Sequence, residues 1–130
     1  MKKYNFNKLI RSNLPERMKK EGVSPFGRHL TDEEFAKELK NKLVKEASEV
    51  QDANSREDMV KELADVMEVI EALTLLHGIT KEEIEKERLL KCNINGRFLA
   101  ANFVDYIEVP VSNYKVIEYL EKRNRPYECN

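Results

Sequence analysis

The fold of this chain is decided by residues 55–78, which read SREDMVKELADVMEVIEALTLLHG. Apolar residues return here at steps of three and four, the spacing of one face of an α-helix. Ser55 can cap the start of that helix, and His77 with Gly78 can end it. The sequence therefore predicts a helix over 56–77 with an apolar surface wide enough for more than one neighbour. That surface comprises Met59, Val60, Leu63, Val66, Met67, Val69, Ile70, Leu73 and Leu76.

Helices of similar type are expected on either side of this stretch. Thr31 and Glu34 have the spacing of a capping box, and the apolar pattern that follows predicts a helix over 31–52. Thr80 and Glu83 repeat that spacing before a third helix, which should end near residue 93, ahead of Gly96. Only a few residues connect the three helices, and such short connections favour antiparallel neighbours.

The flanking segments are less regular. Pro15 lies where a short helix can begin, Gly22 can end it, and Asn113 can cap a final short helix. Residues 98–111 place Pro110 among aromatic and β-branched residues, which predicts an irregular or short extended segment near the C-terminus. We therefore expect an all-α fold, an antiparallel helical bundle formed by a single domain over residues 1–130.

Composition narrows the classes of protein. The 130 residues are 41% hydrophobic and 36% charged, which is compatible with a folded core, and the net charge of −1 argues against binding a nucleic-acid polymer. No apolar run approaches the roughly 18–20 residues of a membrane span, and the first residues lack the hydrophobic segment of a signal peptide. Cys92 and Cys129 show neither metal-ligand nor disulfide spacing. We therefore expect a cytoplasmic protein that does not bind membranes.

Four carboxylates stand out on the two central helices. Glu46 occupies a position within the apolar row of the first helix, and Glu49 shares its face because it lies three residues further on. Glu62 and Asp65 have the same separation on the second helix, where Glu62 again falls among apolar residues. If the helices pack antiparallel across their short loop, the two pairs can face one another.

Four carboxylates in one partly buried place would repel one another and lose hydration. A bound divalent cation offsets both effects, and oxygen ligands without nearby His or Cys favour Mg²⁺ first and Mn²⁺ second. The alternative is that the four acids lie on a solvated, charged helix surface. The positions of Glu46 and Glu62 among apolar residues favour the metal site.

A family resemblance rests on two acidic motifs, EASE at residues 46–49 and ELAD at 62–65, which are separated by twelve residues. They resemble the ExxE…ExxD signature of the all-α nucleoside triphosphate pyrophosphatases, the MazG-like superfamily that includes phosphoribosyl-ATP pyrophosphohydrolase. Together with NKLIR at 7–11 and GRF at 96–98, they resemble the small stand-alone house-cleaning branch over about residues 4–98. The chain departs from that pattern at Lys45, where the family usually has an acid, and at Ser12, where the branch typically has Asp.

The resemblance implies a Mg²⁺-dependent hydrolase that cleaves a nucleoside triphosphate, standard or noncanonical, to a nucleoside monophosphate and pyrophosphate. It also implies that Glu46, Glu49, Glu62 and Asp65 hold the metal and form the catalytic site. Cations must then hold the remaining phosphate charge. The candidates for this substrate-binding role are Arg11, Arg88, Lys91 and Arg97.

Two other functions stay open. One is phosphoribosyl-ATP hydrolysis in histidine synthesis, and the other is a non-enzymatic helical interaction module whose acidic face docks a partner. In either case three helices of this length leave much of the apolar surface of the 56–77 helix uncovered, so we expect a homodimer or a higher homo-oligomer. A nucleotide substrate is the other expected partner.

Overall fold

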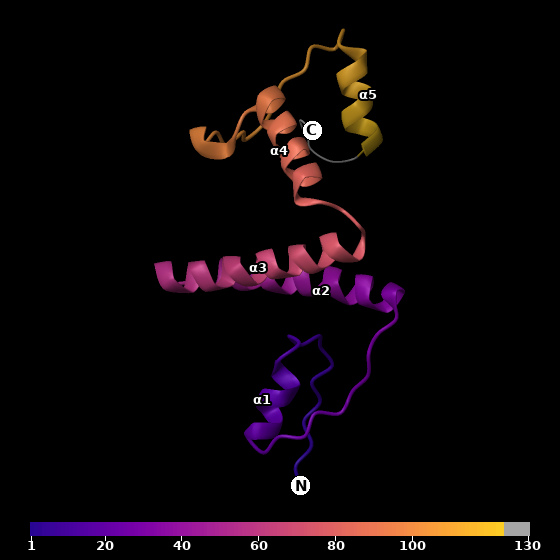
Figure 1. Cartoon of the computed structure of the whole chain (residues 1–130). Coiled ribbons are helices and arrows are strands. Elements are labelled where there is room, and N and C mark those ends of the chain that lie inside the picture. Colours follow the sequence, from indigo (N-terminus) through magenta and orange to yellow (C-terminus); the bar gives the residue numbers. More distant parts are fainter. Residues whose placement is uncertain (124–130) are drawn as a thin grey trace. The chain divides into compact units, whose positions relative to one another are not determined.

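The computed structural model describes residues 1–123, and within them the chain is helical without any strand (Figure 1). The all-α prediction is therefore confirmed. The segment predicted over 98–111 as irregular or extended is irregular over 101–110, but its first three residues, Phe98–Ala100, form a 3-10 helix. Cys129 lies outside the described residues. The elements are α1 (Leu14–Lys20), α2 (Asp32–Gln51), α3 (Arg56–Leu76), α4 (Lys81–Asn95), a 3-10 helix (Phe98–Ala100) and α5 (Tyr114–Arg123).

The chain divides into two compact units, each of which we describe by itself. The first unit spans residues 1–81 and contains α1, α2 and α3. The second begins at Glu82 and contains most of α4, the 3-10 helix and α5. A single domain over residues 1–130 stays a prediction.

The start of α2 is fixed by a complete capping box. The Thr31 hydroxyl accepts a hydrogen bond from the Glu34 backbone N–H at 3.2 Å, and Glu34 Oε1 accepts one from the Thr31 backbone N–H at 3.2 Å. Arg28 Nη2 also donates to Glu34 Oε2 at 2.8 Å. Together these bonds, with that of Arg28 the largest cause, lower the pKa of Glu34 to about 2. The first turn of α2 is therefore held by a carboxylate that is ionised at neutral pH.

The other helices begin and end close to the predicted residues. Ser55 caps α3 by accepting from the Asp58 backbone N–H at 3.0 Å, and Gly78, with φ of 65°, follows its end. Helix α4 continues two residues beyond the predicted end at residue 93 and stops before Gly96, whose φ is 82°. A left-handed glycine is a common helix stop because no Cβ opposes that conformation.

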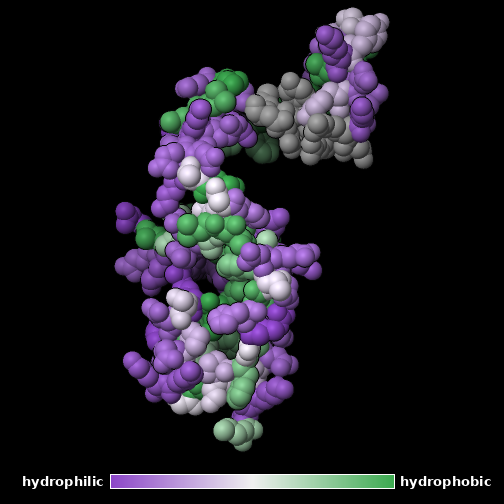
Figure 2. Space-filling model, turned by 45° about the vertical axis from the view of Figure 1, so that its right-hand side comes forward, coloured by the Kyte–Doolittle hydropathy of each residue, from purple (hydrophilic) through white to green (hydrophobic). Residues whose placement is uncertain are grey.

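Helices α2 and α3 run antiparallel side by side and form the packed part of the first unit (Figure 1). Leu39 of α2 and Val69 of α3 are its most buried apolar residues. Much of the apolar surface of α3 stays exposed, including Val60 and Met67, and Figure 2 shows apolar side chains open at the surface over this hairpin. The hairpin thus has a small core of its own and an apolar face beside it.

No helix among residues 1–123 combines the length and the apolarity that a membrane crossing requires.

Candidate functional site

Three of the four predicted carboxylates meet between α2 and α3. Glu46 and Glu49 come from α2, and Glu62 comes from α3. Each offers one carboxylate oxygen, and these oxygens all lie within 4.8 Å of one another. Because the two helices are antiparallel and packed, the three-residue spacing on each of them brings acids from both helices to one place.

Two carboxylate oxygens of this cluster are buried without a partner. Glu46 is only 7% exposed. Among the described residues, neither Glu46 Oε2 nor Glu62 Oε2 accepts a hydrogen bond. A buried, unsatisfied acceptor costs about 1–3 kcal/mol, and a charged one costs more. Converging carboxylate oxygens, two of them without a donor, are the ligand set that a hard divalent cation such as Mg²⁺ prefers, so these residues fit a metal site.

The charge state of Glu46 reflects the same environment. Burial raises the pKa of Glu46 above its ordinary value, and the hydrogen bond and the charge of Glu49 raise it further. The Lys42 ammonium, 3.7 Å from Glu46 Oε1, acts in the opposite direction, while the charge of Asp65 adds a smaller increase. The ionised form of Glu46 is therefore disfavoured, and a bound cation would stabilise it.

The fourth acid has a different partner. Asp65 Oδ1 accepts a hydrogen bond from Arg11 Nη2 at 2.8 Å and is not part of the group of three. Both side chains of this ion pair are largely accessible to solvent, at 64% for Arg11 and 41% for Asp65. The structure thus places Arg11, one of the predicted substrate-binding residues, in contact with Asp65, the second acid of the ELAD motif on α3.

The other three predicted substrate-binding residues gather within the second unit. Arg88, Lys91 and Arg97 line one open pocket of about 560 Å³, whose wall also contains Asn95 and Phe98. Arg88 donates to a carboxylate on its own helix, with 3.0 Å between its Nε and the acceptor oxygen of Glu85. That bond holds the pKa of Glu85 below its usual range. The sequence-predicted cations of this unit therefore form a positively charged pocket.

Sequence reasoning missed Lys42, which is the nearest cation to Glu46. A local signal was available, because Lys42 precedes Glu46 by four residues, the spacing at which side chains on a helix meet. The pairing of Arg11 with Asp65 had no such signal, since 54 residues separate them. Only the tertiary structure brings them together.

Comparison with known families gives one match. A family model described as phosphoribosyl-ATP pyrophosphohydrolase matches residues 6–88, which is more than half of the chain. The matched range contains Arg11 and both acidic motifs and ends at Arg88. Comparisons with curated proteins and with solved structures give no significant match.

Proposed function

This chain belongs to the phosphoribosyl-ATP pyrophosphohydrolase family, within the MazG-like all-α superfamily, and on that premise we propose that it is a Mg²⁺-dependent nucleoside triphosphate pyrophosphohydrolase. Family membership makes it a pyrophosphohydrolase, a hydrolase that acts on phosphoric anhydrides. The proposed reaction cleaves a standard or noncanonical triphosphate between its α- and β-phosphates. The products are a nucleoside monophosphate and pyrophosphate.

One observation carries this proposal. Oxygens of Glu46, Glu49 and Glu62 converge within 4.8 Å, and Glu46 and Glu62 each keep a buried oxygen without a partner. Pyrophosphohydrolases of this family are typically Mg²⁺-dependent, and such an oxygen set suits Mg²⁺, or Mn²⁺ in its place. We propose that these three residues and Asp65 hold the metal and make up the catalytic site.

The residues around the cluster have distinct tasks in the proposed reaction. A bound Mg²⁺ would supply Lewis-acid stabilisation of phosphate oxygens and a lowered pKa for an attacking water. Glu46, Glu49 and Glu62 would hold the ion between α2 and α3, and Asp65 is the fourth carboxylate proposed to hold it. Arg11, which donates to Asp65 in this structure, would bind phosphate oxygens with two parallel hydrogen bonds. Arg88, Lys91 and Arg97 of the second unit stay candidates for binding phosphate.

Phosphoribosyl-ATP is the second candidate substrate, and the description of the matching family favours it as much as it favours a simple triphosphate. The bond broken and the pyrophosphate released are the same in both reactions. The two proposals differ only in what is attached to the triphosphate.

The assembly and the location belong to the same proposal. Exposed apolar residues along α3, among them Val60 and Met67, support a homodimer or a higher homo-oligomer. We propose that the enzyme acts on free nucleotides in the cytoplasm and binds neither membranes nor nucleic-acid polymers.

Product analysis tests the proposed function. The full chain is incubated with Mg²⁺ and a panel of standard triphosphates, noncanonical triphosphates and phosphoribosyl-ATP, and pyrophosphate and orthophosphate are measured separately. Glu62→Gln removes a proposed ligand, while Glu68→Gln changes an exposed acid of α3 outside the cluster. We expect pyrophosphate release by the wild type and by Glu68→Gln, and none by Glu62→Gln. Orthophosphate as the product, or no hydrolysis of any substrate, would refute the proposal.

A further inference from the structure

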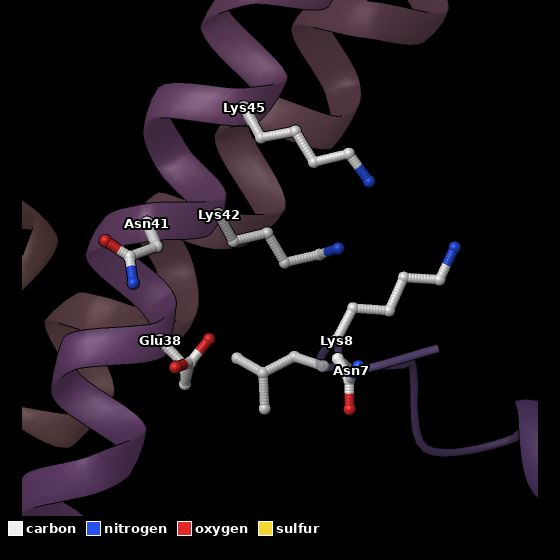
Figure 3. Close-up of a pocket in the computed structure, with 7 residues that line it drawn as sticks. Asn7, Lys8, Glu38, Asn41, Lys42 and Lys45 are labelled. Carbon is white, nitrogen blue, oxygen red and sulfur yellow. The ribbon is translucent and has the colours of Figure 1, made fainter. Parts of the chain in front are cut away.

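An open pocket of about 150 Å³ lies beside α2 in the first unit. Its charged lining residues are three lysines and one acid (Figure 3). Lys42, Lys45 and Glu38 come from α2, and Lys8 comes from the segment before α1. Figure 3 shows Lys42 and Lys45 extending from α2 to the same side, and Lys8 extending from the N-terminal segment into the same region. Three ammonium groups against one carboxylate leave the pocket with an excess of positive charge.

Of these cations, Lys42 is paired with Glu46, whereas Lys8 and Lys45 have no carboxylate partner among residues 1–123. The Lys8 ammonium lies over the Phe6 ring, 4.4 Å from its centroid. A cation–π contact holds the ammonium in place and leaves its charge uncompensated. Lys42 is the most buried of the three, with 25% of its side chain exposed. Ammonium groups that line one pocket favour an anion that can contact all of them.

The pocket is joined to the carboxylate cluster through Lys42. Its ammonium helps to line the pocket and also lies 3.7 Å from Glu46 Oε1. On α2, Lys42 precedes Glu46 by four residues and Lys45 precedes Glu49 by four, so each lysine neighbours one of the proposed metal-binding acids on the helix surface. An anion bound in the pocket would therefore contact the same lysine, Lys42, that contacts Glu46.

We propose that Lys8, Lys42 and Lys45 bind the pyrophosphate group that leaves in the hydrolysis. This inference rests on the proposed function and adds to it the position of the leaving group. Lysine ammoniums bind phosphates as point charges, and three of them from two segments suit a diphosphate better than a single phosphate. As the bond between the α- and β-phosphates breaks, negative charge grows on the leaving pyrophosphate, and fixed cations stabilise it there.

Calorimetric titration of inorganic pyrophosphate into the full chain, with EDTA present, tests this site without any turnover. The variants are Lys45→Gln and Lys8→Gln, and the matched control is Lys40→Gln, an exposed lysine of α2 that does not line the pocket. We expect each pocket variant to weaken pyrophosphate binding about tenfold, as loss of about 1.4 kcal/mol would. Lys40→Gln should bind like the wild type, and all variants should keep the thermal midpoint and the Mn²⁺ affinity of the wild type.

Three outcomes would overturn the inference: wild-type affinity in both pocket variants, no pyrophosphate binding by the wild type, or orthophosphate binding as tight as that of pyrophosphate. Failure of the proposed function is separable from these results. If the chain binds pyrophosphate through the lysines and hydrolyses no nucleotide, the proposed reaction fails and the binding site stands. If it releases pyrophosphate while the lysine variants bind normally, the reaction stands and this site does not.

Discussion

At the scale of the residue, Glu46 combines burial with charge. It lies in the apolar row of α2, which buries it, and its carboxyl faces Glu49 and Glu62, which makes that burial unfavourable for an anion. A residue that only served stability would be apolar at this position. The position of Glu46 is therefore best explained by a ligand that balances its charge.

The first prediction concerns the stability of the metal-free protein. Because the pKa of Glu46 is raised in the folded state, its contribution to stability is fully present below its ordinary value of 4.5 and is lost as the pH rises through the folded pKa. Glu46→Gln does not titrate, so relative to the wild type it should gain stability as the pH rises from acidic to neutral. Urea unfolding in EDTA at a series of pH values measures this difference. A difference that stays constant with pH would contradict the prediction.

The second prediction concerns Arg11. Its ion pair with Asp65 is exposed, and exposed pairs contribute only about 0–1 kcal/mol. Arg11→Ala should therefore change the free energy of unfolding by less than about 1 kcal/mol. It should also tighten Mn²⁺ binding, because Asp65 loses a competing cation, and weaken nucleotide binding. Calorimetry with Mn²⁺ and with a non-hydrolysable nucleotide measures both effects, and weaker Mn²⁺ binding in the variant would exclude competition for Asp65.

Residues that lie on one helix were accessible to sequence analysis. The interruption of an apolar row predicted an unusual place for Glu46, and the structure buries it. The contact between Arg11 and Asp65 was not accessible, because it depends on how the segment before α1 returns to α3. Sequence spacing contains no information of that kind.

At the scale of the element, the capping box decides where α2 begins. A change at this N-terminus affects the site only through the helix that carries Glu46 and Glu49. Substitution of the cap residue therefore changes the stability of α2 and leaves the carboxylates of Glu46 and Glu49 unchanged.

The third prediction is that Thr31→Ala lowers the free energy of unfolding by about 0.5–2 kcal/mol, the usual loss for an N-cap residue. Lys37→Ala, an exposed change within α2, serves as the control and should have a smaller effect.

The same cap makes stability depend on pH. Because the pKa of Glu34 is lowered to about 2, the contribution of this carboxylate to the free energy of unfolding is present above pH 4.5 and is lost as the pH falls through about 2. Glu34→Gln should therefore be less stable than the wild type at neutral pH, and urea unfolding should show this difference in the free energy of unfolding disappearing in acid. A difference that persists at low pH would show that charge is not involved.

Helix bounds were predictable wherever a side chain or a glycine sets them. Thr31 and Ser55 are the N-caps of α2 and α3, as predicted, and α2 begins one residue after the predicted start at 31. Helix α4 runs past its predicted end because nothing at Asn93 or Ile94 stops it, whereas Gly96 adopts a left-handed conformation. The sequence predicted that the stretch over 101–110 is irregular, but it did not predict the course of its backbone, because no periodic pattern is present there.

At the scale of the whole molecule, the apolar surface of α3 exceeds what α2 covers. The periodicity predicted this surface, and the structure leaves Val60 and Met67 at 56% and 69% exposed. What covers such a surface is not encoded in the pattern of one helix, because any complementary apolar face would satisfy it.

The fourth prediction is that the wild type is a homodimer or larger and that Met67→Glu weakens its self-association roughly 10- to 100-fold. Burial of a methionine side chain contributes about 1.5–3 kcal/mol, which corresponds to that range. Lys61→Glu, on the polar part of α3, is the matched control for the added acid. Light scattering over a range of concentrations measures the equilibrium. A wild type that stays monomeric would remove the proposed assembly.

The fifth prediction tests the claim on which the proposed function depends, that the carboxylates between α2 and α3 hold a divalent cation. The measurement is Mn²⁺ binding, followed by paramagnetic resonance, to the wild type, Glu62→Gln and Glu68→Gln. Loss of outer-shell partners alone changes metal affinity about 10- to 100-fold, so loss of a direct ligand should weaken it at least about tenfold. We predict that weakening for Glu62→Gln and wild-type affinity for Glu68→Gln. Equal Mn²⁺ affinity in all three proteins would contradict the account.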